Sequence, residues 1–198
     1  MGLELNYING QTPIDEDEKK GLLITTISNR GELDEFEQVN IQKAVEWSMK
    51  NKFSIKRILT QKFITELHKR MFGKVWKWAG EFRNSNKNIG VDQFQISLEL
   101  KKLIDDTKFW VENKSFANEE VVIRFKHRLV KIHLFPNGNG RHSRLIADIF
   151  VSHVFGLPYF TWGSKNLTEI SETRRKYITA LKNADNNSYE KLLKFARE

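Results

Sequence analysis

Residues 133–144 read His-Leu-Phe-Pro-Asn-Gly-Asn-Gly-Arg-His-Ser-Arg, and this stretch decides both the fold and the candidate function. Gly138 and Gly140 can adopt positive φ angles and let backbone N–H groups approach an anion closely. Residues 141–155 have the pattern of a helix, which places the turn at a helix N-terminus. The N–H groups and macrodipole of a helix N-terminus favour phosphate. The stretch therefore predicts a phosphate-binding turn.

The same twelve residues carry side chains suited to a polyphosphate ligand. Arg141 and Arg144 are three residues apart, so we expect them on one helical face, close enough to clamp the same phosphate chain. His133 lies directly upstream and can accept a proton near neutral pH. The spacing predicts a site that binds phosphates and transfers a proton.

This pattern resembles the signature of the Fic (Fic/Doc) family, His-x-Phe-x-[Asp/Glu]-Gly-Asn-Gly-Arg-x-x-Arg. Every specified position matches except the acidic one, where this chain has Asn137. Residues 78–83, Trp-Ala-Gly-Glu-Phe-Arg, and the later Asn88-Ile89-Gly90 resemble the segment that forms the Fic target-docking flap. Residues 31–41 resemble the start of the Fic subgroup called mobile mystery protein B. The resemblance covers residues 15–185, strongly at the motif and weakly elsewhere.

The resemblance implies a protein adenylyltransferase with ATP as co-substrate. His133 would accept the proton of a Ser, Thr or Tyr hydroxyl of a target protein, while that hydroxyl attacks the α-phosphorus of ATP. Arg141 would bind the β-phosphate and Arg144 the γ-phosphate. The implied nucleotide-binding residues are Gly138, Asn139, Gly140, Arg141 and Arg144, and the implied target-docking residues are Arg83, Asn88, Ile89 and Gly90.

Asn137 replaces the acidic residue that holds Mg²⁺ in the family. An amide oxygen can still ligate Mg²⁺, but it lacks the charge that hard cations prefer. Three interpretations stay open: a weaker Mg²⁺ site at Asn137, a metal held mainly by phosphates and water, or a different donor and reaction.

An N-terminal glutamate is a candidate inhibitory residue. Many Fic proteins carry a [Ser/Thr]-x-x-x-Glu-[Gly/Asn] helix whose glutamate pairs with the second motif arginine. Ser28-Asn29-Arg30-Gly31-Glu32-Leu33 fits until Leu33, which makes Glu32 the candidate, with Glu35 and Glu37 as alternatives on the same helix. The simpler interpretation is that Glu32 is a first-turn residue favoured by the helix dipole.

Composition narrows the class of protein. The 198 residues include no cysteine, which excludes disulfides and thiolate metal sites. No apolar run is long enough to span a membrane, and no signal peptide is evident, so we expect a cytoplasmic, bacterial-type protein. The net charge of +8 suggests an anionic partner. A solvated lysine-rich surface is the favoured explanation, and nucleic acid is not the expected partner.

The periodicity predicts an all-α helical bundle with a small β-hairpin at residues 80–96, and the resemblance implies that this bundle has the Fic fold and that the hairpin is its flap. We expect one domain over residues 1–198: an N-terminal helical extension over 1–50, a Fic core over 55–185 and a C-terminal helix over 186–198. One predicted helix, starting near Asn29, carries an inward stripe of Leu33, Phe36, Val39, Ala44 and Trp47. Another starts after Thr60, and a third delivers His133.

Two other functions compete with AMP transfer. A Doc-like phosphotransferase would move the γ-phosphate instead, but the intact Gly138-Asn139-Gly140 turn and Arg144 resemble the AMP-transferring branch. A catalytically weak nucleotide-binding module, acting through an antitoxin or regulatory partner, is favoured only by Asn137. The sequence leaves the target protein and a possible oligomer open.

Overall fold

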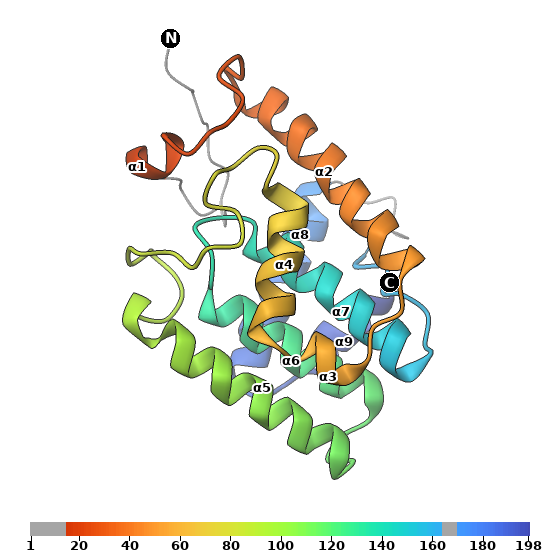
Figure 1. The fold of residues 1–198 in the computed structure, drawn as a ribbon. Coiled ribbons are helices and arrows are strands. Elements are labelled where there is room, and N and C mark those ends of the chain that lie inside the picture. The colour runs from red at the N-terminus through yellow and green to blue at the C-terminus, as the bar shows by residue number, and fades with distance from the viewer. Residues whose placement is uncertain (1–14, 164–169) are drawn as a thin grey trace.

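The computed structural model describes residues 15–163 and 170–198, and these ranges are mostly helical (Figure 1). The elements are α1 (Glu16–Lys19), α2 (Arg30–Lys50), α3 (Ile55–Ile58), α4 (Gln61–Phe72), a 3-10 helix η1 (Gln93–Gln95), α5 (Ile96–Glu112), α6 (Asn118–Ile132), α7 (Asn139–Phe155), α8 (Ile170–Asp185) and α9 (Glu190–Arg197). An isolated bridge joins Leu22 and Trp76, and no extended strand forms in the described ranges. The all-α prediction is confirmed.

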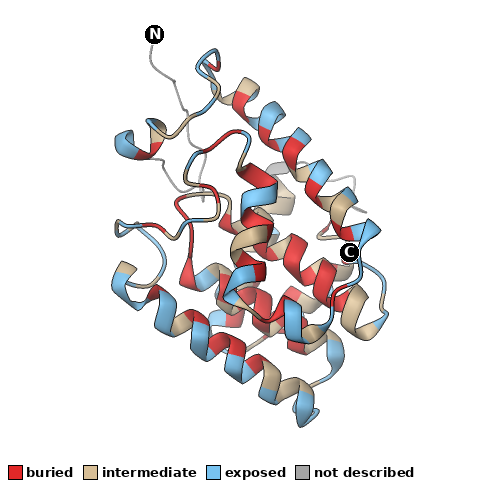
Figure 2. Ribbon diagram, viewed as in Figure 1, coloured by how far each residue is buried: buried red, intermediate tan, exposed pale blue. Residues whose placement is uncertain are grey.

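The pair of helices on either side of the motif forms the centre of the bundle. The two helices α6 and α7 pack against each other, α5 covers α6, and α2 lies along α4 (Figure 1). Helix α8 pairs with α9, which also contacts α6. Figure 2 shows buried positions concentrated on α4, α6 and α7, while α5 alternates buried and exposed residues. The motif loop therefore joins the two most buried helices.

The helix signals in the sequence hold at α4. The Thr60 side chain caps this helix by accepting a hydrogen bond from the Phe63 N–H at 3.1 Å. Phe63, Leu67 and Met71 are all buried, as their spacing of four predicted. Helix α4 thus presents one apolar face to the core, directly under the motif loop.

The predicted inward stripe of α2 is wrong at two positions. Leu33 and Ala44 are buried, but Phe36 is 43% and Val39 is 51% exposed. The buried face instead runs through Leu33, Glu37, Asn40, Ala44 and Ser48. Polar groups occupy this face because it lies against the motif region. There Glu37 binds Trp76 and Arg141.

The predicted β-hairpin flap is also wrong. Residues 80–96 contain no strand. The segment is irregular chain except for the short helix η1 and the start of α5. The two ends of this segment bond to the motif loop: Arg83 N–H donates to Leu134 O at 2.9 Å, and Val91 N–H donates to Ile132 O at 3.3 Å. These backbone groups are satisfied by residues 132–134, so they are not available to pair with each other.

Candidate active site

The motif loop begins at a histidine with a left-handed backbone. His133 ends α6 at φ 59° and ψ 65°, a conformation that side chains with a Cβ rarely adopt. Its carbonyl accepts a hydrogen bond from Arg83 Nε at 2.7 Å. The flap residue Gly90 lies so close that a Cβ there would come 2.7 Å from His133 Cβ. The flap segment therefore holds His133 in this conformation from outside.

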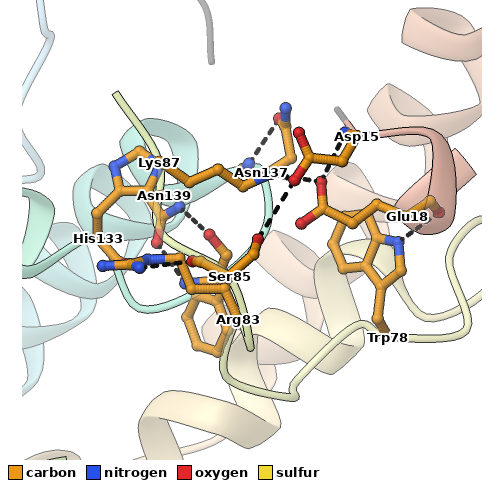
Figure 3. Close-up of polar contacts among 11 residues, drawn as sticks. Asp15, Glu18, Trp78, Arg83, Ser85, Lys87, His133, Asn137 and Asn139 are labelled. Atoms are coloured by element: carbon orange, nitrogen blue, oxygen red, sulfur yellow. Dashed lines mark hydrogen bonds and ion pairs between the residues drawn. The ribbon is translucent and has the colours of Figure 1, made fainter. Parts of the chain in front are cut away.

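Arg83 points inward rather than to solvent. Its guanidinium is buried and donates to three carbonyl oxygens, those of His133, Ser85 and Val91 (Figure 3). All of these partners are backbone, so the guanidinium braces the flap against the motif loop. The sequence signalled Arg83 only as part of the flap, because nothing local shows that its partner lies fifty residues away.

His133 is neutral at physiological pH. Burial lowers the pKa of its imidazole to about 4, and the positive charges of Arg83 and Lys87 act in the same direction. A neutral imidazole has a lone pair available for a proton. Burial therefore keeps His133 unprotonated, as a proton acceptor must be, while it also lowers the basicity of the ring.

The interior of the loop is held by two other polar side chains. Asn139 accepts from Phe135 N–H at 3.0 Å and donates to Phe135 O at 2.7 Å, so its amide is committed to the loop backbone. The buried His68 donates from Nε2 to Asn137 O at 3.0 Å and accepts at Nδ1 from Gly80 N–H at 2.9 Å. His68 was assigned no role from the sequence, yet it fixes the carbonyl at the apex of the loop.

The two glycines of the turn have different reasons to be glycine. Gly138 has φ 78°, and a Cβ there would meet the Phe72 ring at 2.6 Å. At Gly140 a Cβ would lie in open space beside the helix, with no other part of the described chain within 4 Å. Gly140 lies in the first turn of α7, where backbone N–H groups have no intrahelical acceptor. This open side of the helix N-terminus is where an anion can approach.

Arg141 is already paired with a glutamate from α2. Its Nη1 donates to Glu37 Oε2 at 2.6 Å, and Glu37 is 2% exposed. The other oxygen of Glu37 accepts from Trp76 Nε1 at 2.6 Å, which orients the carboxylate. A phosphate that binds Arg141 must therefore compete with a buried, well-oriented carboxylate.

Glu32 caps the start of α2 and pairs with no arginine among the described residues, so its inhibitory role stays a prediction. Its carboxylate accepts from Ser28 N–H at 2.8 Å and from Ser28 Oγ at 3.2 Å. Together with the Asn29 side chain, which accepts from Glu32 N–H, it caps the start of α2. The α2 carboxylate that reaches a motif arginine is Glu37, and the arginine is Arg141.

Arg144 faces a different helix from Arg141. Its guanidinium lies 5.7 Å from the centre of the Tyr177 ring on α8. Arg141 contacts α2 through Glu37 and lies over the Phe72 ring at 4.9 Å. The two arginines, predicted to share one face, flank the N-terminus of α7 from two sides.

The rest of the flap is anchored at one end and exposed at the other. Lys87 binds Asp15 and Glu18 at 2.7 Å each, which ties the flap to α1 (Figure 3). Asn88, Ile89 and Gly90 are exposed, next to His133. These three predicted docking residues are accessible to a target chain, which Arg83 is not.

Where the family signature places its acidic Mg²⁺ ligand, this chain offers an amide, and the weak Mg²⁺ site at Asn137 stays a prediction. The Asn137 amide oxygen accepts from Gly138 N–H at 2.7 Å, and the position carries no charge. The carboxylates near the loop, Glu37 and Glu18, are engaged by Arg141 and Lys87. Among the described ranges, no three histidine, aspartate or glutamate side chains gather to hold a metal ion.

The comparisons with known proteins agree with this geometry. Residues 58–151 match the model of the Fic/DOC family. The protein adenylyltransferase Fic of Aedes aegypti is 33% identical over 94 residues, which are 46% of this chain and 19% of that protein. The chain therefore spans about a fifth of the length of this curated relative. These matches support a Fic-family assignment for this chain, while its subgroup stays a prediction.

Solved structures support the same fold. The BepC protein of Bartonella tribocorum, solved with bound AMPPNP, has a TM-score of 0.67 at 18% identity, covering 92% of this chain and 97% of that one. A fragment of Fic-1 from C. elegans has a TM-score of 0.62 at 20% identity, covering 90% of this chain and 51% of that one. The Fic fold thus extends beyond the segment that the family model matches.

Proposed function

We propose that this protein transfers AMP from ATP to a Ser, Thr or Tyr hydroxyl of a target protein, with His133 as the general base. The observation that carries the proposal is a neutral, buried histidine at the start of a loop that leads into an open helix N-terminus. In the reaction, the hydroxyl oxygen bonds to the α-phosphorus as its proton passes to the His133 ring. The bond from the α-phosphorus to the bridging oxygen breaks, and pyrophosphate leaves.

The phosphates are bound by the first turn of α7 and by the motif arginines. In this proposal the backbone N–H groups of Asn139 and Gly140 face the phosphate chain, and the open space beside Gly140 leaves room for it. Both arginines lie on α7. Arg141 would approach the phosphates from the side that α2 covers, and Arg144 from the side that α8 covers. In-line positioning and charge neutralisation supply most of the rate of such transfers. Mg²⁺, where bound, would add further charge neutralisation through phosphate and water ligands.

Arg83 is a positioning residue in this proposal, and the exposed end of the flap receives the target. Asn88, Ile89 and Gly90 offer an exposed backbone to an extended target segment beside His133. Arg83 keeps the His133 carbonyl in place by donating a hydrogen bond to it. The single domain over residues 1–198 and a regulatory or antitoxin partner remain predictions alongside this one. Of the described part of the chain, no helix has the length and hydropathy to cross a membrane.

The test is incubation of the protein with a cell lysate and ATP labelled at either the α- or the γ-phosphate. Label from the α-position on protein, absent with a His133→Ala variant, is the expected result. Label from the γ-position alone would replace AMP transfer with Doc-like phosphotransfer.

A nucleotide-binding module with weak catalysis is the second candidate. It is favoured by the Glu37–Arg141 pair and by Asn137, whose amide oxygen is already bonded to Gly138. ATP binding without transfer from either position of the label would support it.

A further inference from the structure

Three arginines from three helices converge beside the motif. Arg30 is the first residue of α2, Arg144 lies in the second turn of α7, and Arg174 is on α8. Arg174 is one turn before Tyr177, whose ring contacts Arg144. Their positive charges are close enough to interact: burial first, and then Arg144 and Arg30, lower the pKa of the Arg174 guanidinium.

The cluster has unused hydrogen-bond donors. The Nε atoms of Arg30 and of Arg174 are buried, and neither has a hydrogen-bond acceptor among the residues that the structure describes. Buried N–H groups are normally satisfied, so unpaired ones at a cluster of like charge point to a ligand that supplies the acceptors. Arginine donors suit a phosphate because the planar guanidinium can bind two oxygens at once.

Few carboxylates balance this charge. Asp34 pairs with Arg30 at 2.9 Å. Asp148 lies near Arg144, but burial raises the pKa of Asp148 to about 7, so it is only partly ionised at neutral pH. The buried Lys126 lies 4.4 Å from the centre of the Tyr177 ring. Burial, with Arg144 acting in the same direction, lowers the pKa of Lys126 well below the ordinary lysine value, so it is not counted as a charge. Over the described residues, the positive charge around Arg144 therefore comes from the arginines Arg30 and Arg174.

We infer that Arg30, Arg144 and Arg174 form a subsite for the terminal phosphate of a polyphosphate chain, which makes a nucleoside triphosphate the preferred ligand. The inference rests on the proposed function, because Arg144 belongs to both. It adds Arg30 and Arg174, which lie outside the motif. The subsite gives a shared role to α2 and α8, which are far apart in the sequence and each place an arginine near Arg144. The same chemistry would accept inorganic polyphosphate, so the test includes it.

The test compares Arg174→Gln with Arg175→Gln by isothermal titration calorimetry. Arg175 is the exposed neighbour on α8, so its substitution removes the same charge from the surface. The titrants are ATP, AMP and inorganic tripolyphosphate. Losing one charge-assisted contact corresponds to about a tenfold change in affinity. We expect Arg174→Gln to weaken ATP and tripolyphosphate about tenfold and AMP by less than about twofold, and Arg175→Gln to change each ligand by less than about twofold.

Two results would overturn the subsite. One is an equal loss of ATP affinity in both variants, and the other is a loss for AMP as large as that for ATP. If tripolyphosphate binds as tightly as ATP, the nucleoside is not part of what this protein selects, and the preference for a nucleoside triphosphate is wrong. If Arg174→Gln does not fold, as judged by circular dichroism, Arg30→Gln and Arg174→Lys take its place. We expect Arg30→Gln to weaken ATP and tripolyphosphate binding about tenfold. Arg174→Lys should weaken it less, because lysine keeps the positive charge but lacks the planar guanidinium that binds two oxygens.

The outcome is separable from that of the transfer proposal. Weakened tripolyphosphate binding in Arg174→Gln, with no α-label transfer by any variant, keeps the subsite and rejects AMP transfer. Normal α-label transfer, with Arg174→Gln and Arg175→Gln alike in all three titrations, rejects the subsite and keeps AMP transfer.

Discussion

Replacing Glu37 with glutamine should increase the affinity of the protein for ATP. Glu37 holds Arg141 at 2.6 Å from within the core, so a phosphate must displace it to bind the same guanidinium. The amide oxygen of glutamine can still accept from Trp76 Nε1, which bonds to Glu37 at 2.6 Å. The substitution therefore removes the competing charge with little change in shape.

The size of the effect follows from the contact. A hydrogen bond to a charged group contributes about 1.5–3 kcal/mol net, and about 1.4 kcal/mol is a tenfold change in affinity. The Arg141 side chain is 28% exposed, so water weakens the pair and the lower value applies. We expect ATP and ADP to bind about tenfold more tightly, and AMP, which has no β-phosphate, to change by less than about twofold. Stability should fall by about 1–2 kcal/mol, because Arg141 loses its partner.

The assay is calorimetry with ATP, ADP and AMP, together with thermal unfolding. Glu35→Gln is the matched control, since Glu35 is an exposed residue on the same helix and its substitution removes the same charge. Unchanged ATP affinity in Glu37→Gln, or an equal gain in Glu35→Gln, would refute the competition between Glu37 and phosphate for Arg141. A gain for AMP as large as that for ATP would show that Arg141 does not distinguish the β-phosphate.

The remaining predictions concern the motif itself. His133→Ala should abolish α-label transfer and leave ATP affinity within about twofold, because a general base contributes to rate rather than to binding; substantial residual transfer would exclude His133 as the base. The neutral form of His133 is the active one and its pKa is about 4, so transfer should stay constant from about pH 7 to about pH 5.5 and be lost toward pH 4. A midpoint near the ordinary histidine pKa of about 6.5 would contradict this. Asn137→Asp should lower the Mg²⁺ concentration needed for transfer, since it supplies a carboxylate; an unchanged titration would show that this position does not serve the metal. Arg144→Ala should weaken ATP binding more than AMP binding, and equal losses by calorimetry would remove Arg144 from the phosphate site.

Stability should depend on pH in the same acidic range. Burial lowers the pKa of His127, His133 and His142 to about 4, below their value in the unfolded chain. The stability these neutral histidines confer is therefore complete above about pH 6.5 and is lost as the pH falls toward about 4. Unfolding measured by circular dichroism separates this loss from the titration of His133 in catalysis.

The sequence could predict the features that depend on neighbouring residues. The cap at Thr60 and the buried stripe of α4 follow from spacing along one helix. The turn follows from Gly138, which has a positive φ as expected, whereas Gly140 lies in α7 with a helical φ; the family assignment follows from the motif. Where the prediction failed, a distant partner decided the outcome. The flap forms no hairpin because its ends bond to residues 132–134, and Phe36 is exposed because α2 turns Glu37 inward.

By itself, the sequence determined that the chain is helical and that a Gly-Asn-Gly turn follows a histidine at the end of one helix. Only the tertiary structure decided which groups act on that turn. Glu37 meets Arg141 across 104 positions, Arg83 holds His133 across 50, and Arg144 meets a ring on α8. The neutral state of His133 likewise arises from burial by the assembled core. Local patterns specify helices and turns, because these close over a few residues. Contacts between distant residues depend on how those helices pack, which no short stretch of sequence records.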